Sequence, residues 1–153
     1  MLTHKGTKEI HTNRLLLRKY RLSDTEQMFE NYASDDRVTK YLSWKAYSKP
    51  SDIIPFLEMS IKDYEKSSTY HWAIEYEGKM IGSISVMSVD DLRNNCEVGK
   101  HRIMAKHDIE NKASGEVMKK CKMSYEGRLK EYYLRHDGTY SDALVYGIVN
   151  ENN

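Results

Sequence analysis

Apolar positions near the start of the chain follow two different spacings. Residues 10–18 predict an opening strand, in which Leu15 and Leu17 lie on one face. Ser23 and Glu26 then have the spacing of a capping box, an oxygen acceptor followed three residues later by a glutamate. The pattern therefore predicts a strand followed by a helix.

Helical spacing continues over the next forty or so positions. Residues 34–42 predict a short helix, and residues 49–52 predict the start of a longer one. Pro55 falls in the first turn, where its missing N–H costs little. The apolar stripe of this helix is Ile54, Leu57, Ile61 and Tyr64.

Alternation returns after residue 70 and predicts antiparallel strands. A hairpin is expected from residues 72–76 and 80–89 with a turn at 77–79, and a short strand from residues 102–106. A helix follows, with a stripe of Ala113, Val117, Met118 and Cys121.

A second hairpin, residues 128–149 with a turn at 136–139, closes the chain and places Leu144, Tyr146 and Ile148 on one face. The order of helices and strands predicts an α/β fold with a mixed sheet. Even composition and the absence of a linker or repeat predict one domain, residues 1–153.

Composition narrows the class of protein. The chain has 24 Lys and Arg against 23 Asp and Glu, a net charge of +1 that argues against a nucleic-acid binder. No apolar stretch approaches the roughly 18 residues of a membrane span, and the first residues lack the apolar core of a signal peptide. Two cysteines do not suggest a secreted disulfide scaffold. These features predict a soluble, cytoplasmic protein without a membrane partner.

Short catalytic motifs are mostly missing from the sequence. It contains no Gly-x-Gly-x-x-Gly, no phosphate-binding Gly-Lys-Ser/Thr loop and no His-Glu-x-x-His. His101 and His107 lack neighbouring ligands suited to zinc, so no metal site is expected.

Residues 103–127 resemble the strand–Asn-x-x-Ser–helix segment of the GNAT N-acetyltransferases, in the branch that includes the ribosomal-protein N-acetyltransferases. Asn111 and Ser114 supply the Asn-x-x-Ser motif. Further stretches resemble the same branch in the same order along the chain: 12–18, 34–38 with Tyr41-Leu42, 72–82, Glu97-Val98-Gly99 and Tyr140-Ser141-Asp142.

The resemblance implies an acyl-CoA N-acyltransferase-like fold and acetyl transfer from acetyl-CoA to a primary amine, either a protein N-terminus or a small amine. In this family, residues matching Asn111 and Ser114 face the pantetheine arm, and Ser114 is the candidate proton donor to the departing thiolate. Glu97 or Glu131 is the candidate carboxylate that takes the amine proton. Lys119, with Lys120 beside it, is a candidate for the CoA phosphates. Without the resemblance, Asn111 reads as a turn residue and Ser114 as a helix cap.

One departure from the family lies between Gly99 and His101. The family has about thirty residues there, including a Gly-containing pyrophosphate loop and the helix it opens. A parallel strand pair needs a crossover of about a dozen residues, so the usual central pair is not expected and the fold is incomplete there. Two arrangements are open: residues 96–107 form one continuous or bent strand, or the halves pair differently, with another chain among the options.

The resemblance and this departure from it point to two alternative functions. The first is an acetyl-CoA-dependent N-acetyltransferase. The second is a catalytically impaired deletion variant, a small α/β module that binds a partner or forms a homodimer through exposed strands.

Overall fold

The computed structural model describes residues 4–86, 89–90, 95–96 and 102–149. They belong to two compact units, one of residues 3–39 and 46–86 and the other of residues 1–2, 40–45 and 87–153. The first unit contains β1 (Ile10–His11), β2 (Leu16–Arg18), η1 (Leu22–Asp24), α1 (Thr25–Met28), η2 (Phe29–Ala33), α2 (Asp36–Thr39), η3 (Pro50–Ile53), α3 (Ile54–Asp63), β3 (His71–Tyr76) and β4 (Lys79–Ser85). The second contains β5 (Val89–Asp90), β6 (Asn95–Cys96), β7 (Arg102–Asp108), α4 (Lys112–Lys120), β8 (Ser124–Leu134) and β9 (Tyr140–Val149). The predicted mixed α/β class is confirmed.

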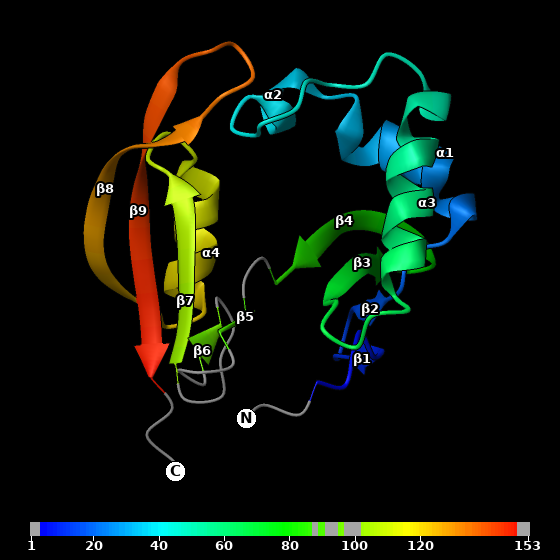
Figure 1. Ribbon diagram of the computed structural model, residues 1–153, viewed down its shortest axis with the longest axis horizontal. Coiled ribbons are helices and arrows are strands. Elements are labelled where there is room, and N and C mark those ends of the chain that lie inside the picture. The colour runs from blue at the N-terminus through cyan, green and yellow to red at the C-terminus, as the bar shows by residue number, and fades with distance from the viewer. Residues whose placement is uncertain (1–3, 87–88, 91–94, 97–101, 150–153) are drawn as a thin grey trace. The chain divides into compact units, whose positions relative to one another are not determined.

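The first unit is built on an antiparallel sheet of order β1-β2-β3-β4. Helices α1 and α3 lie beside this sheet (Figure 1). Fully or almost fully buried apolar side chains fill the space between them, and include Met28, Ala33, Ile53, Leu57, Ala73 and Met80.

The expected single strand over residues 10–18 is wrong, because the chain reverses within it. β1 and β2 pair with each other, with Ile10 opposite Leu17. The Thr12 hydroxyl drives the reversal by accepting the backbone N–H of Leu15 at 2.8 Å, while the Thr12 N–H donates to the Leu15 carbonyl at 2.9 Å.

The expected capping box is also wrong in its residues. The helical segment begins earlier, at Leu22, and the Asp24 carboxylate accepts the backbone N–H of Arg21 at 2.8 Å. Ser23 therefore lies inside the first turn. The helix then widens into the π-helix η2, and α2 covers only four of the residues expected from 34–42.

The long helix and the first hairpin are confirmed, with changes in detail. α3 follows η3, which begins at Pro50, but its buried face is Ile53, Leu57 and Ser60, while Ile54 is 36% exposed. β3 and β4 are joined by Glu77 and Gly78, both with positive φ, as type I′ hairpin turns require. β4 ends at Ser85, short of the predicted end at residue 89.

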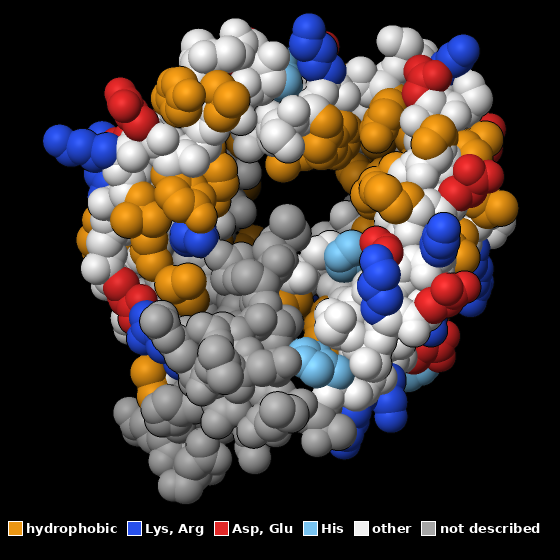
Figure 2. Space-filling model, viewed as in Figure 1, with side chains coloured by type: hydrophobic (Ala, Val, Ile, Leu, Met, Phe, Trp, Pro, Cys, Tyr) orange, Lys and Arg blue, Asp and Glu red, His pale blue; other side chains and the backbone are white. Residues whose placement is uncertain are grey.

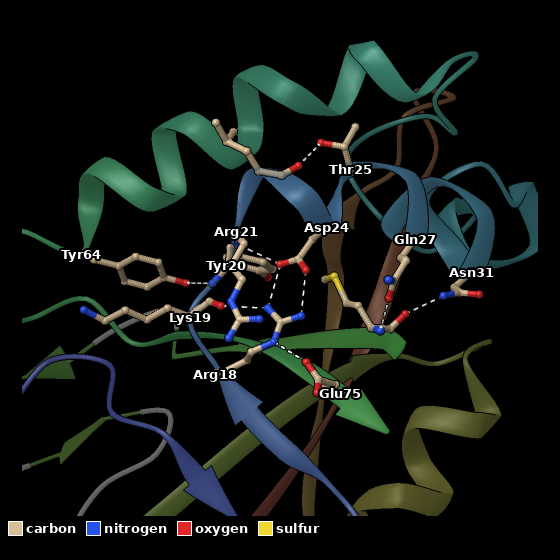
Figure 3. Close-up of polar contacts among 12 residues, drawn as sticks. Arg18, Lys19, Tyr20, Arg21, Asp24, Thr25, Gln27, Asn31, Tyr64 and Glu75 are labelled. Carbon is tan, nitrogen blue, oxygen red and sulfur yellow. Dashed lines mark hydrogen bonds and ion pairs between the residues drawn. The ribbon is translucent and has the colours of Figure 1, made fainter. Parts of the chain in front are cut away.

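A buried ion-pair network anchors β2 in this unit (Figure 3). The Arg18 guanidinium donates to both carboxylate oxygens of Asp24, at 2.8 and 2.9 Å, and its Nε donates to Glu75 at 2.5 Å. Arg18 and Asp24 are each only 3% exposed. The hydrogen bond to Asp24 raises the pKa of Arg18 despite its burial. The network ties β2 to η1 and to β3.

The second unit contains a sheet of order β5-β6-β7-β9-β8. β6 and β7 are separate strands that pair in parallel, with Cys96 opposite Ile103. Of the two arrangements left open, the single strand over residues 96–107 is therefore wrong, and separate pairing of the two halves is confirmed. Contrary to the expectation for a short connection, the two strands pair in parallel within one chain. The pairing is confined to this short contact, which needs far less connecting chain than two long parallel strands would. Residues 97–101, where the family's extra span would insert, lie outside the described residues.

Helix α4 lies alongside β7 (Figure 1). The hairpin of β8 and β9 is confirmed, and β9 also pairs with β7 along its whole length. The predicted helical stripe is confirmed only at Met118, which is buried. Val117 is 60% exposed and Cys121 is exposed, while Gly115, outside the predicted stripe, is buried. The helix turns Gly115 inward because a histidine ring from β7 fills the space beneath it.

Figure 2 shows hydrophobic side chains among charged ones on the visible surface. In the β8–β9 hairpin the exposed ones include Tyr125, Leu129, Tyr132, Leu134 and Tyr140. Among the described residues, no helix has both the length and the apolar composition that crossing a membrane requires.

Candidate functional site

The turn from β7 into α4 carries the two residues of the Asn-x-x-Ser motif. Asn111 is the N-cap of α4, and its side-chain oxygen accepts the backbone N–H of Ser114 at 3.1 Å. The capping role therefore belongs to Asn111, and the alternative that Ser114 is the cap is wrong. Capping satisfies one of the free N–H groups that every helix start exposes.

This arrangement leaves two polar groups of the motif unengaged. Because Oδ1 of Asn111 faces the helix, its Nδ2 amide group points elsewhere, and no residue that the structure describes accepts a hydrogen bond from it. The Ser114 hydroxyl is half-buried and has no hydrogen-bond partner within residues 4–86, 89–90, 95–96 and 102–149. Two hydrogen-bonding groups, three residues apart on one side of a helix start, can thus serve a ligand.

A buried histidine lies beneath this helix start. His107 is 5% exposed, and its Nδ1 lies 2.7 Å from the carbonyl oxygen of Asp108. A carbonyl only accepts, so Nδ1 carries the hydrogen in this contact. Nε2 has no partner in the described part of the chain. A Cβ at Gly115 would lie 3.0 Å from Nε2, closer than most Cβ contacts, so glycine at this position suits the close approach of α4 to the ring.

An aromatic stack continues from His107 across the sheet. The His107 and Tyr146 ring centroids are 5.6 Å apart, and the Tyr146 and Tyr125 centroids are 5.7 Å apart in an edge-on arrangement. The register places His107, Ala105 and Ile103 opposite Leu144, Tyr146 and Ile148, respectively. The predicted common face of β9 therefore supports α4.

Lys119 does not join Asn111 and Ser114. It lies five residues after Ser114, which places it about 140° around the helix and about 7.5 Å along it. Its ammonium group forms an exposed ion pair with Glu116 at 2.7 Å, and this partner raises the pKa of Lys119. The Lys119 ammonium group, which was expected to meet a CoA phosphate, pairs with Glu116 instead.

Glu131 lies in a bulge of β8, opposite Asp142 of β9. It has a positive φ of 48° and donates its backbone N–H to the Asp142 carboxylate at 2.7 Å. Its own carboxylate is exposed, and no hydrogen bond or ion pair joins it to Asn111 or Ser114 within the described residues. Glu97, the other candidate for accepting the amine proton, lies outside the described residues.

Sequence reasoning missed the residues that support the turn, above all Asp108, Arg135 and His107. Asp108 and Arg135 are 27 positions apart, and no local pattern connects them. Only the strand order β7-β9-β8 brings the end of β7 near the end of β8.

Comparison with known proteins adds to this geometry. A family model described as the acetyltransferase (GNAT) domain matches residues 14–100. This match ends at Lys100, between Gly99 and His101, where the sequence analysis expects a departure from the family. The Asn111–Ser114 turn lies beyond it, and its role rests on the geometry above.

Relatives and solved structures span almost the whole chain. The uncharacterized N-acetyltransferase YoaA of Bacillus subtilis is 25% identical and matches 92% of this chain and 96% of its own. That alignment spans 171 positions, 18 more than the 153 residues here, so the relative contains residues with no counterpart in this chain.

Two solved structures have the same fold. One is the microcin C7 self-immunity acetyltransferase MccE in complex with acetyl-CoA and AMP, with a TM-score of 0.79, 19% identity, and 91% of this chain and 94% of that chain covered. The other is RimL, the ribosomal L7/L12 α-N-protein acetyltransferase in complex with coenzyme A, with a TM-score of 0.77, 15% identity, and 95% and 100% covered. The domain model matches more than half of this chain, which shows that the chain belongs to the GNAT acetyltransferase family.

Proposed function

We propose that this protein transfers the acetyl group of acetyl-CoA to a primary amine, either a protein N-terminus or a small amine. The observation that carries the proposal is the Asn111 cap, which leaves the Asn111 amide and the Ser114 hydroxyl free at the start of α4. Membership of the GNAT family supplies the reaction class. Two proteins with the same fold form complexes with acetyl-CoA and with coenzyme A, which supports acetyl-CoA as the co-substrate here.

The free groups fit the needs of this reaction. The amine nitrogen attacks the thioester carbonyl, a C–N bond forms and the C–S bond breaks. The departing thiolate needs a proton, which the Ser114 hydroxyl would donate and then recover from water. The Asn111 Nδ2 group would donate to an amide carbonyl of the pantetheine arm.

The proton lost by the amine needs an acceptor. Glu97 and Glu131 stay the two candidates, each acting through water. The carboxylate of Glu131 is exposed, so the amine proton would reach it through water molecules. A role of Lys119 at the CoA phosphates requires that Lys119 leave Glu116, and an exposed ion pair of this kind adds little stability because water solvates both charges.

The proposal is tested by following release of the CoA thiol from acetyl-CoA, with small amines and short peptides as acceptors. Ser114→Ala should lower kcat at least tenfold, while Ser68→Ala, an exposed serine of the other unit, should leave it unchanged. Equal activity of both variants would remove Ser114 from the reaction. Absence of acetyl-CoA turnover with every acceptor tested would instead favour the second function, a partner-binding or homodimeric α/β module.

A further inference from the structure

We infer that Arg135 is a positioning residue, which holds the β7–α4 turn in the conformation that presents Asn111 and Ser114 to acetyl-CoA. The inference rests on the proposed function, because it concerns the same site. Arg135 lies just past the end of β8 and makes no hydrogen bond to Asn111 or Ser114 in the described structure. Its influence would pass through Asp108, the last residue of β7.

Arg135 and Asp108 form a two-pronged pair away from water. Nε of Arg135 donates to Oδ2 of Asp108 at 2.9 Å, and Nη2 donates to Oδ1 at 2.8 Å. The two side chains are only 11% and 2% exposed. Such a fork fixes the orientation of the carboxylate as well as its position.

Asp108 passes this orientation on to the turn. Its Oδ1 also accepts the backbone N–H of Glu110 at 2.9 Å, and its carbonyl accepts the backbone N–H of Asn111 at 2.8 Å. Ile109 between them donates its N–H to the carbonyl of Asp142 at 2.9 Å. Every backbone N–H from residue 109 to the N-cap is therefore held, two of them by Asp108.

Arg135 is itself fixed from several sides, as a positioning residue needs to be. Its Nη2 donates to the Ser141 hydroxyl at 3.0 Å and lies 3.2 Å from the Glu110 carboxylate. Its guanidinium carbon lies 6.0 Å from the centroid of the Tyr41 ring. Together these partners hold the guanidinium in the orientation in which it pairs with the Asp108 carboxylate.

Loss of the guanidinium would leave the buried Asp108 carboxylate without its partner, which drives local rearrangement. If the turn then holds its present conformation only one tenth of the time, the apparent Kd for acetyl-CoA rises about tenfold. The rate of the chemical step changes little, because the bound state still contains Asn111 and Ser114 in place.

The test compares Arg135→Met with Arg102→Met, whose arginine pairs with Glu126 at the other end of β7. Arg135→Met should raise the Kd and KM for acetyl-CoA about tenfold with kcat within about twofold, and Arg102→Met should leave all three unchanged. Arg135→Lys keeps the charge but loses the fork, so it should show a smaller rise of the same sign and keeps the test available if Arg135→Met does not fold. A fall in kcat without a change in Kd would overturn the inference.

Amide hydrogen exchange in the unliganded protein separates this inference from the proposed function. Exchange at Glu110 and Asn111 should accelerate in Arg135→Met and not in Arg102→Met. If wild-type protein binds no acetyl-CoA but this difference appears, the proposed function fails while the positioning of the turn stands. If exchange at these amides is the same in both variants, Arg135 does not position the turn.

Discussion

The side-chain oxygen of Asn111 accepts the backbone N–H of Ser114 at 3.1 Å, and this single bond gives the asparagine two separable roles. Its oxygen caps the helix, and its amide nitrogen remains free for a ligand. Asn and Asp are about equally good caps, but only Asn has the amide donor.

Asn111→Asp should therefore keep the stability of the protein and lose affinity for acetyl-CoA. Asn111→Ala should lose both, with a fall of about 1 kcal/mol in the free energy of unfolding. Urea unfolding and acetyl-CoA titration of the two variants measure these effects. Full affinity in Asn111→Asp would show that the Nδ2 group does not contact the ligand.

The ion pair of Arg18 and Asp24 should contribute far more to stability than the surface pairs. Asp24→Ala leaves a buried guanidinium without its main partner and should lower the free energy of unfolding by about 3–5 kcal/mol. The matched control is Asp63→Ala in the same unit, whose partner Lys66 is 69% exposed, so this variant should leave the free energy of unfolding nearly unchanged. Urea unfolding measures both, and equal costs would contradict the importance given to burial.

The end of α4 carries strain at Lys122. Met123 donates its N–H to the Met118 carbonyl and Lys122 donates to Lys119, the two bonds of a Schellman motif. Lys122 has the positive φ of 59° that this motif requires and that glycine adopts without cost.

Lys122→Gly should therefore stabilise the protein by about 1 kcal/mol, whereas Lys120→Gly inside the helix should destabilise it by a similar amount. Thermal unfolding of the two variants checks the opposite signs. A loss of stability in both would mean that the left-handed conformation at residue 122 is not populated in solution.

Tyr64 should make the protein sensitive to alkaline pH. Its hydroxyl accepts the backbone N–H of Tyr20 and donates to the carbonyl of His71, and burial raises its pKa to about 12. The folded state thus holds this proton more tightly than the unfolded state, in which tyrosine titrates near 10. The stabilisation is complete below about pH 10 and is lost as the pH rises toward 12.

Tyr64→Phe should be less stable at pH 8 but should lose stability less steeply between about pH 10 and 12. Tyr140→Phe is the control, because Tyr140 is 62% exposed and makes no comparable bonds among the described residues. Denaturant midpoints measured across this pH range give the slopes. Equal slopes of stability against pH in wild type and Tyr64→Phe would contradict a raised pKa of Tyr64 in the folded protein.

Local patterns predicted those features that depend on neighbours in sequence. The turn at Glu77-Gly78, the helix after Pro50 and the closing hairpin all follow from residues within a few positions of one another. The Asn111–Ser114 turn was found through its resemblance to the family, and its capping bond is also local.

Features set by tertiary contacts were missed. The chain reverses at Thr12, and β2, the strand after the reversal, pairs with β3, which lies far along the sequence. Helix α4 buries Gly115 rather than Val117 because His107 lies beneath it, and no periodicity in the helix reveals that ring. The pair of Arg135 and Asp108 depends on strand order, which the sequence pattern left open.

The most direct test of the central claim is thermal unfolding of the purified protein with and without millimolar acetyl-CoA. A ligand present at 100 times its Kd stabilises the folded state by about 2.7 kcal/mol. For a chain of this size that corresponds to a rise in Tm of about 5–10 °C. A rise of this size that disappears in Asn111→Asp is the result we predict. A cooperative transition with the same Tm in the presence and absence of acetyl-CoA would contradict the account.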